Sequence, residues 1–256
     1  MTARFDLDIR DYIGLPDRKR HYNERHFTAA APRYDLATRA MSLGRDVAWK
    51  RRLVAALPDL ASPVCVDLAC GTGDLTRLLA DKYPHGTIVG LDLTAPMLAL
   101  ARVRNRQPNV RFTRQDMGAV GVATESADVV TGAYALRNAP ELGRTLDEIR
   151  RILKPGGVAA FLDFAKPATR FLQAPECRLL KTWCGFWGLA LHANPEIHAY
   201  IASSLEVFPD RLQLRAMFAE RGLTLTASRA FFLGITELVV FRKSPDPAKP
   251  PRTAGP

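Results

Sequence analysis

A pair of glycines followed by a carboxylate is the pattern in this sequence with the clearest chemical meaning. The hydrophobic run from Val64 to Ala69 leads into Gly71 and Gly73, and Asp92 ends a second such run 21 residues after Gly71. Glycine lets a backbone approach a ligand closely, and a carboxylate at this spacing holds ribose hydroxyls. The pattern predicts a site for a nucleoside-containing cofactor. The alternative for Asp92 is a strand-end acid that caps the next helix.

A dinucleotide is a less suitable ligand than S-adenosylmethionine for this loop. Thr76 stands where the third glycine or alanine of a dinucleotide fingerprint is expected, Asp67 precedes the glycines, and Asp74 opens the helix. Acids at a helix N-terminus repel a pyrophosphate. They suit a ligand that carries an ammonium group and a sulfonium, as S-adenosylmethionine does.

The run Asp67-Leu-Ala-Cys-Gly-Thr-Gly resembles the first motif of class I methyltransferases, and Gly90-Leu-Asp-Leu-Thr-Ala-Pro-Met-Leu resembles the second. A third run, Arg114-Gln-Asp-Met, resembles the place where these enzymes hold the adenine amino group. By this resemblance the glycines line the methionine part of the cofactor and the motif residues surround its nucleoside. The implied cofactor-binding residues are Asp67, Gly71, Thr72, Gly73, Asp92, Leu93, Met97, Asp116 and Met117. Met97 also has the helical spacing of a core residue.

A more selective resemblance begins with Ala-Tyr-Ala-Leu-Arg-Asn at 133–138 and continues with Arg-Ile-Leu-Lys-Pro-Gly-Gly at 151–157. Both are similar to the C-methyltransferases of ubiquinone and menaquinone biosynthesis. Segments near Tyr34, Ser42, Trp49 and Tyr200 agree, so the resemblance covers about residues 27–242. It implies methyl transfer to a ring carbon of a small aromatic acceptor, a quinol that carries a prenyl tail. Departures at 163–167, at 208–209 and after Asp116 fall on the acceptor side and leave another aromatic or polyketide-like ring open as acceptor.

Four residues near the ends of the fourth and fifth predicted strands are candidates for the chemistry. Arg137 is the candidate cation for a phenolate oxygen, because guanidinium groups favour anionic oxygens. Tyr134 is expected to form a pocket wall, Asn138 to donate an orienting hydrogen bond, and Asp163 to serve as a base. The structural alternatives are an Arg137 ion pair, a helix-capping Asn138 and a strand-end Asp163. Tyr200, Trp183 and Trp187 are expected to line the acceptor pocket, although aromatics at helical spacing are more often core.

Elements that would position these residues alternate along the chain. Hydrophobic runs begin at 64, 87, 110, 127 and 158, with helix-like segments at 74–83, 95–106 and 141–153, the last ended by a Lys-Pro-Gly-Gly turn. Alternation of this kind predicts an α/β fold with a parallel sheet and helices on both faces, and runs that begin at 223 and 237 predict a terminal pair of strands. The resemblance to class I methyltransferases implies a mostly parallel seven-stranded Rossmann-like sheet with an antiparallel C-terminal strand. We expect a helical N-terminal extension at 1–60, a methyltransferase domain at 61–244 with a helical insertion at 170–208, and a disordered proline-rich tail at 245–256.

Composition limits the partners. No apolar run of 18 residues occurs, and the N-terminus lacks the layout of a secretory signal, so we expect a cytoplasmic enzyme. The four cysteines have no metal-ligand spacing, so no metal is expected. The formal charge of +10 indicates an anionic partner, but scattered arginines and 8% aromatic residues argue against nucleic acid. The oligomeric state stays open, a homodimer included.

The charge also suggests a membrane partner. Residues 1–52 contain twelve Lys and Arg and seven Asp and Glu. Residues 165–192 contain four Lys and Arg and one Glu, and they include Trp183, Phe186 and Trp187. Basic residues attract anionic lipid and aromatic rings suit the interface, so we expect weak, reversible contact with the inner face of a membrane. The alternative is that the basic helices only solvate the surface and the aromatics are buried.

Two other function classes share features with this sequence. A methyltransferase that acts on nitrogen or oxygen of a lipid head group or natural product would carry the same cofactor motifs. A non-catalytic module that binds the cofactor or RNA would also keep the fold, although the intact Asp67, Gly71, Gly73 and Asp92 argue against loss of cofactor binding. Assays across a panel of acceptors separate these classes.

Overall fold

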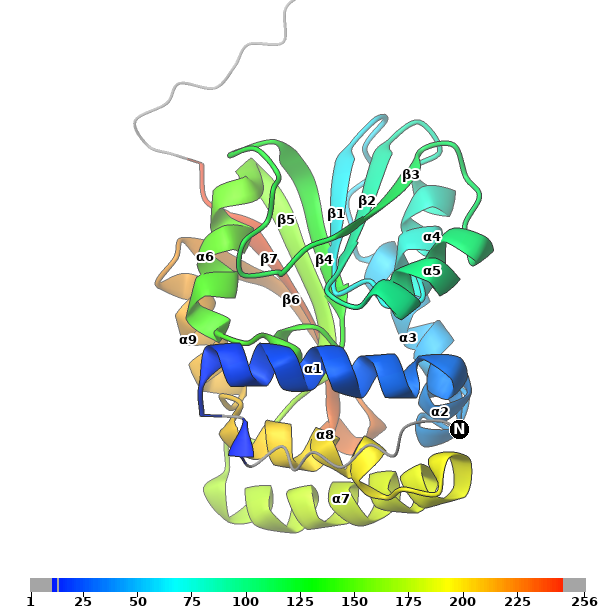
Figure 1. The fold of residues 1–256 in the computed structure, drawn as a ribbon. Helices are drawn as coiled ribbons and strands as arrows, with labels where there is room; N and C mark the ends of the chain where they lie inside the picture. Colours follow the sequence, from blue (N-terminus) through cyan, green and yellow to red (C-terminus); the bar gives the residue numbers. More distant parts are fainter. Residues whose placement is uncertain (1–10, 13, 246–256) are drawn as a thin grey trace, which may run out of the picture.

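The computed structural model describes residues 11–12 and 14–245, and a twisted sheet with helices around it dominates this part of the chain (Figure 1). Its seven strands run in the order β3-β2-β1-β4-β5-β7-β6. The strands are β1 Val64–Leu68, β2 Thr87–Asp92, β3 Val110–Arg114, β4 Ala127–Ala133, β5 Leu153–Phe164, β6 Leu223–Phe231 and β7 Thr236–Lys243. Strands β1 to β5 pair in parallel, whereas β7 is antiparallel to both β5 and β6. The predicted fold class is therefore confirmed.

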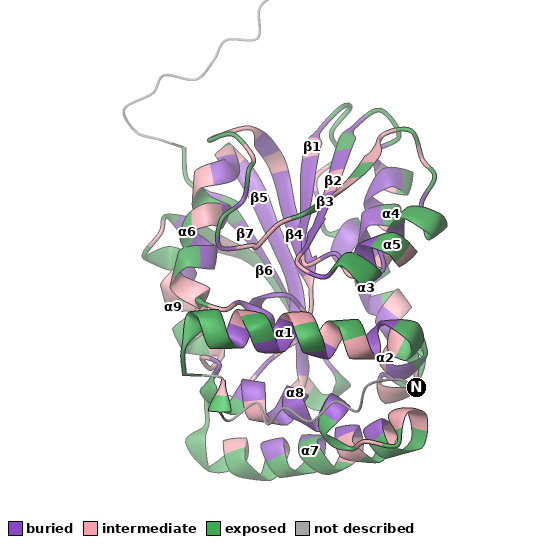
Figure 2. Cartoon of the chain, viewed as in Figure 1, coloured by how far each residue is buried: buried purple, intermediate pink, exposed green. Residues whose placement is uncertain are grey.

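Alternating strand residues bury two separate cores. Val66, Ala159 and Phe161 belong to the core on one face of the sheet. Cys65 and Ala160 belong to the core on the other face. Because successive side chains of a strand point to opposite faces, this division places helices on both faces of the sheet. The helices of the parallel units are α4 Asp74–Lys82, α5 Ala95–Arg104 and α6 Leu142–Ile152, and α9 Arg211–Ala219 follows them. Most of the sheet is buried between them (Figure 2).

The elements end close to where the sequence predicts, with one difference. The Lys-Pro-Gly-Gly segment, expected as a turn, belongs to β5, and Leu153 pairs with Ala127 before the register shifts. Gly156 has φ of +77°, which glycine adopts without steric cost, so the strand can bend there and still keep its partner. The helix before it therefore ends at Ile152, one residue earlier than expected.

Helices from two separate parts of the chain lie beyond one end of the sheet (Figure 1). The N-terminal ones are α1 Pro16–Ala30 and α2 Tyr34–Met41, whereas α3 Asp46–Ala55 packs against α4 and β5. The predicted insertion forms α7 Arg170–His192 and α8 Glu196–Val207, which pack on each other. This end holds the carboxyl ends of the parallel strands, where open α/β sheets bind ligands. The tail expected at 245–256 lies, beyond its first residue, outside the described residues.

Candidate active site

The loop after β1 meets the end of β2 through a shared carboxylate. The N–H of Gly71 donates to Oδ2 of Asp92 at 2.8 Å, and the N–H of Thr94 donates to Oδ1 at 2.8 Å. Burial raises the pKa of Asp92, and the two backbone donors oppose this shift because they stabilise the carboxylate. Asp92 thus both closes the loop and faces a cavity.

That cavity, the cofactor cavity, encloses about 620 Å³ of empty space, part of it open to solvent. Its lining contains six of the predicted cofactor residues: Gly71, Asp92, Leu93, Met97, Asp116 and Met117. Asn23 and Phe27 of α1 also belong to the lining. The lining thus joins residues at the ends of the strands to residues of α1.

The two motif glycines have different surroundings. Gly71 has φ of +54°, and a Cβ built on it would meet nothing within 4 Å, so its Cα side faces open space. Gly73 has φ of +83°, and a Cβ there would lie 2.4 Å from Nδ2 of Asn105. Gly71 leaves room for a ligand, whereas Gly73 allows the start of α4 to pack closely against α5.

Three other predicted cofactor residues lie outside the lining. Asp67 is fully buried beneath the loop, where its carboxylate accepts hydrogen bonds from Thr76 Oγ1 at 2.7 Å and Thr131 Oγ1 at 3.0 Å. Thr72 Oγ1 donates to Asp35 at 2.7 Å, and Gly73 packs as described. The structure gives these residues contacts that shape the loop rather than contacts with the cavity.

Asp116 lines the cofactor cavity but already has partners. Its Oδ2 accepts a hydrogen bond from Arg20 Nε at 2.6 Å, and its Oδ1 accepts from the N–H of Gly118 at 2.8 Å. Met97 is 1% exposed within α5 yet reaches the lining, so its core and cavity roles coexist. The Arg20 contact ties α1 to the nucleoside side of the cavity.

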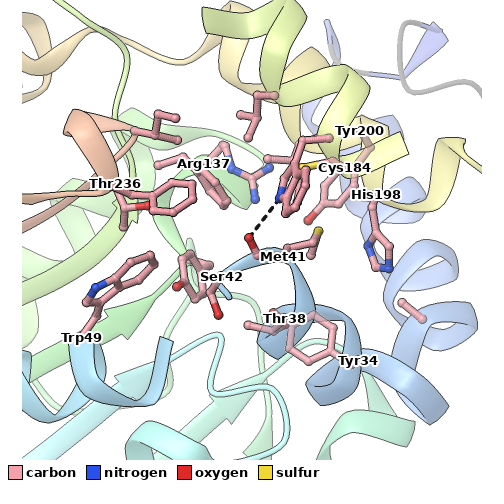
Figure 3. A pocket seen from close by; sticks show the side chains of 18 of the residues that line it. Tyr34, Thr38, Met41, Ser42, Trp49, Arg137, Cys184, His198, Tyr200 and Thr236 are labelled. Atoms are coloured by element: carbon pink, nitrogen blue, oxygen red, sulfur yellow. Dashed lines mark hydrogen bonds between the residues drawn. The ribbon is translucent and has the colours of Figure 1, made fainter. Parts of the chain in front are cut away.

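A second cavity, the acceptor cavity, lies beside the first and holds about 700 Å³ of empty space (Figure 3). Helices α1, α2, α7 and α8 supply most of its wall, and Trp49 of α3, Arg137 and residues near the ends of β4, β5 and β7 supply the rest. Most lining side chains are apolar or aromatic. The polar lining residues are His26, Tyr34, Thr38, Ser42, Tyr134, Arg137, His198, Tyr200 and Thr236.

Arg137 is 2% exposed and lines the acceptor cavity. Its Nη1 donates to Ser204 Oγ, and its Nε lies 3.7 Å from Oδ1 of Asp163. The guanidinium carbon lies 5.2 Å from the ring centroid of Tyr200 and 5.4 Å from that of Phe164. Burial by itself would lower the pKa of Arg137, but Tyr200 and Asp163 outweigh it and raise the pKa. Arg137 is therefore a fixed cation in an apolar cavity.

Asp163 does not reach the cavity where a base was expected. Its Oδ2 accepts from the N–H of Arg137 at 3.2 Å and its Oδ1 from the N–H of Phe164 at 2.8 Å. It lines neither the cofactor cavity nor the acceptor cavity. Burial raises its pKa, and the Arg137 guanidinium opposes the shift. These contacts make Asp163 a residue that holds Arg137 in place.

Asn138 links the two cavities through hydrogen bonds. Its Nδ2 donates to the carbonyl oxygen of Tyr134 at 2.8 Å, and its Oδ1 accepts from Tyr200 Oη at 3.4 Å. It lines the cofactor cavity rather than the acceptor cavity. Tyr134 has φ of +59°, an uncommon conformation for an aromatic residue, and the Asn138 contact supports it.

The cavities share a wall made of Phe27, Tyr34 and Tyr134. Burial raises the pKa of both tyrosines, so they are neutral phenols at neutral pH. Burial also lowers the pKa of His198 to about 4 and lowers the pKa of His26 well below its usual value, so both imidazoles are neutral. Among the described lining residues, Arg137 alone carries a full charge in the acceptor cavity.

The predicted acceptor residues are divided. Tyr200 and Trp183 line the cavity, and Trp183 Nε1 donates to the carbonyl oxygen of Met41 at 3.0 Å. Trp187 packs on Trp183 and Phe186 but is absent from the lining. Sequence reasoning assigned no role to His26 or His198, since a single histidine in an apolar helix carries no distinguishing pattern.

Residues 17–240 match the ubiE/COQ5 methyltransferase family. The chain belongs to this family. It is 35% identical over 201 residues to a demethylmenaquinone methyltransferase of Thermus thermophilus, and the aligned residues cover 78% of this chain and 91% of that protein. It is 34% identical over 223 residues to a 2-phytyl-1,4-naphtoquinone methyltransferase of Thermosynechococcus vestitus, with 85% and 97% covered. This member of the ubiE/COQ5 family is therefore a methyltransferase, as the motifs predict.

Solved structures with the same fold are methyltransferases of low sequence identity. A methyltransferase of Haloferax volcanii in complex with the activator Trm112 superposes with a TM-score of 0.65 at 18% identity, covering 86% of this chain and 98% of that one. A geranyl diphosphate methyltransferase in complex with sinefungin gives 0.62 at 13% identity, covering 77% and 78%. These likenesses support the fold of this ubiE/COQ5 family member. No helix in its described part is long and apolar enough to cross a membrane.

Proposed function

We propose that this enzyme transfers a methyl group from S-adenosylmethionine to a ring carbon of a quinol with a prenyl or similar apolar tail. The observation that carries the proposal is that the cofactor cavity adjoins an apolar cavity with one buried cation, because Phe27, Tyr34 and Tyr134 belong to the linings of both. The relatives that methylate demethylmenaquinone and phytyl-naphthoquinone support the acceptor class.

The cofactor cavity fits S-adenosylmethionine chemically. Asp92 offers a carboxylate to the ribose hydroxyls, Met97 and Met117 offer apolar surface to the adenine, and Gly71 leaves space for the methionine part. When bound, this cofactor supplies an electrophilic methyl group. The residues of the shared wall exclude water and align the acceptor ring, and alignment of this kind accounts for much of the rate in a displacement.

Arg137 activates the acceptor in this proposal. A quinol ring carbon becomes more nucleophilic as its neighbouring hydroxyl gives its proton to water, and a fixed guanidinium stabilises the oxygen charge that develops. The ring carbon that gains the methyl group would then lose its own proton to water. The partners Asp163 and Ser204 hold the guanidinium before the acceptor arrives. The apolar part of the cavity, including Met41, Leu180 and Ile201, suits the tail.

The test uses purified enzyme, S-adenosylmethionine with a labelled methyl group, and reduced short-chain demethylmenaquinone. We expect labelled product whose new methyl group is on a ring carbon, as mass spectrometry and carbon NMR locate it. Phenolic, amine and lipid head-group acceptors serve as the comparison panel. Transfer to oxygen or nitrogen of the panel without transfer to the quinol carbon would contradict the proposed acceptor. Absence of transfer to every acceptor would contradict the enzyme proposal.

We further propose that the enzyme reaches its acceptor at a membrane surface, since a quinol with a long apolar tail resides in the bilayer. The excess of basic residues supports contact with anionic lipid.

A further inference from the structure

Helix α7 contacts the rest of the enzyme through one side only. Its buried residues are Cys177, Leu180, Cys184 and Gly188, and it packs mainly on α8 and α2. Leu180, Trp183 and Cys184 line the acceptor cavity. In Figure 1 this helix is the outermost element at the end of the molecule that contains the cavity. The wall of the acceptor cavity is thus one helix thick here.

The opposite side of α7 exposes large apolar side chains. Phe171 is 77% exposed, Leu179 64%, Phe186 58% and Leu189 59%. At about 100° per residue, these four positions fall within about 80° of the helix circumference. The stripe therefore runs along the whole length of the helix, and Figure 2 shows exposed residues along the outer side of α7. Contiguous exposed apolar surface of this kind indicates an interaction site.

A row of cations flanks the stripe. Arg170, Arg178 and Lys181 are exposed and occupy the adjoining sector of the helix, within about 80° of one another. Among the described residues none of the three forms an ion pair with a carboxylate. The acid of this helix, Glu176, is only partly exposed, on the inward side. The outer side of α7 is thus apolar along its middle and cationic along one flank.

We propose that this α7 outer face, defined by Phe171, Leu179, Phe186 and Leu189 with the flanking cations, docks on an anionic lipid bilayer. An apolar stripe buries its side chains at the acyl boundary while neighbouring cations bind anionic head groups. A second copy of the chain would bury the stripe equally well but would bring the unpaired cations of the two copies near each other. The proposal rests on the proposed function, because docking there brings the acceptor cavity next to the bilayer that holds the acceptor.

The structure also changes which aromatics take part. Trp183 lies toward the acceptor cavity and is held by Met41, and Trp187 is partly buried with its Nε1 enclosed. Phe171 and Phe186 are the exposed rings of α7. The sequence pointed to Trp183, Phe186 and Trp187 together; of these, Phe186 belongs to the α7 outer face, and Phe171 is the other exposed ring there.

Vesicle flotation tests the apolar stripe. The whole chain is mixed with vesicles of phosphatidylcholine and 30–40% phosphatidylglycerol, about a third anionic lipid, at low salt. We expect Phe171→Ser/Phe186→Ser to lower the partition coefficient at least about tenfold. The control Val103→Ser/Leu212→Ser alters two residues exposed to 68% and 62% on α5 and α9, and should leave the partition within about twofold. Equal losses in both variants would overturn the assignment to α7.

The cationic flank is tested with variants of equal net charge. Arg178→Gln/Lys181→Gln and Arg106→Gln/Arg111→Gln each remove two exposed cations, the first pair from α7 and the second from around the start of β3. We expect the α7 pair to lower the partition about 30-fold and the control pair less than about threefold. A similar fall in both would show that the total charge, and not this face, attracts the lipid. No binding of the unaltered enzyme at low salt would remove the proposal.

Two further measurements separate this inference from the proposed function and from a subunit interface. The Phe171→Ser/Phe186→Ser variant should methylate a short-chain acceptor in solution at the normal rate, yet methylate a long-chain acceptor in vesicles at least about tenfold more slowly. If the unaltered enzyme methylates the soluble acceptor but does not float, the docking surface falls and the function stands. If it floats but methylates no acceptor, the function falls instead. Dissociation of a stable dimer by this variant, seen by sedimentation equilibrium, would assign the face to a second copy.

Discussion

The carboxylate of Asp92 accepts a hydrogen bond of 2.8 Å from the backbone N–H of Gly71, so the end of β2 fixes the loop that follows β1. Gly71 follows β1 and Asp92 ends β2, which are neighbouring parallel strands, and both residues line the cofactor cavity. A ribose bound there would meet a carboxylate whose orientation the protein has already set. This arrangement reduces the ordering that binding would otherwise require.

The Asp92→Ala variant should bind S-adenosylmethionine at least about 100-fold more weakly. Two charge-assisted hydrogen bonds to ribose hydroxyls, each of about 1.5 to 3 kcal/mol, would be lost. Titration calorimetry measures the dissociation constant, and thermal unfolding shows whether the loop survives without its Gly71 and Thr94 contacts. Asp92→Asn is the control that keeps the shape of the side chain. An unchanged dissociation constant in a folded Ala variant would mean that Asp92 does not bind the ribose.

Alanine at the two motif glycines should separate cofactor binding from folding. Gly71→Ala places a methyl group in open cavity space, so we expect cofactor affinity to fall about tenfold or more, which is about 1.4 kcal/mol. Its left-handed backbone adds a stability loss of about 1–2 kcal/mol. Gly73→Ala has the same backbone cost and also forces Asn105 aside, so its free energy of unfolding should fall by a further 1–3 kcal/mol or so, about the cost of overpacking. Calorimetry measures the cofactor affinity of both variants, and urea unfolding measures their stability. Equal losses of stability in the two variants would contradict the prediction.

Arg137→Lys should lower turnover about 100-fold while cofactor affinity stays unchanged. Lysine keeps the charge but loses the planar fork that contacts Ser204 and Asp163 together. Arg137→Ala is a poorer test, because it leaves the Asp163 carboxylate buried without its cation, a loss of about 3–5 kcal/mol in stability. The double variant Arg137→Ala/Asp163→Asn avoids that buried charge. Near-normal turnover of the folded double variant with saturating quinol would make Arg137 structural.

Asp67→Asn should gain stability relative to the unaltered enzyme as the pH rises from 4 to 7. Burial raises the pKa of Asp67 to about 6, against 3.8 for an ordinary aspartate, although Thr76 and Thr131 donate to it. Between these values the folded state binds more protons than the unfolded state, so ionisation of Asp67 destabilises the fold as pH increases. The asparagine variant lacks this titration, and the difference should grow by about 2–3 kcal/mol. Urea unfolding at several pH values measures it, and a constant difference would refute a raised pKa.

The order of strands and helices follows from local sequence signals. Runs of β-branched and apolar residues predict β1 to β4 almost to the residue, and the glycines and Asp92 mark the cofactor side because their spacing is set within one βα unit. Asp210 caps α9 through its own next turn, another local effect. The segment before Val158 was missed as strand, because its pairing with β4 outweighs the turn preference of Pro155 and Gly156.

The partners of the site residues depend instead on segments far apart in the chain. Arg137 contacts Asp163 and Ser204 only because β5 and α8 converge beside the end of β4. The local sequence does not predict that Asp163, the expected base, pairs with Arg137, the expected cation. The shared wall similarly joins Phe27 and Tyr34 to Tyr134, about 100 residues later. Sequence by itself determined the order of the elements and the place of the cofactor loop, since periodicity and turn chemistry act over a few residues, and the resemblance of its motifs indicated the family. Tertiary packing decided which polar groups face a cavity, because burial and pairing depend on every element that closes around them.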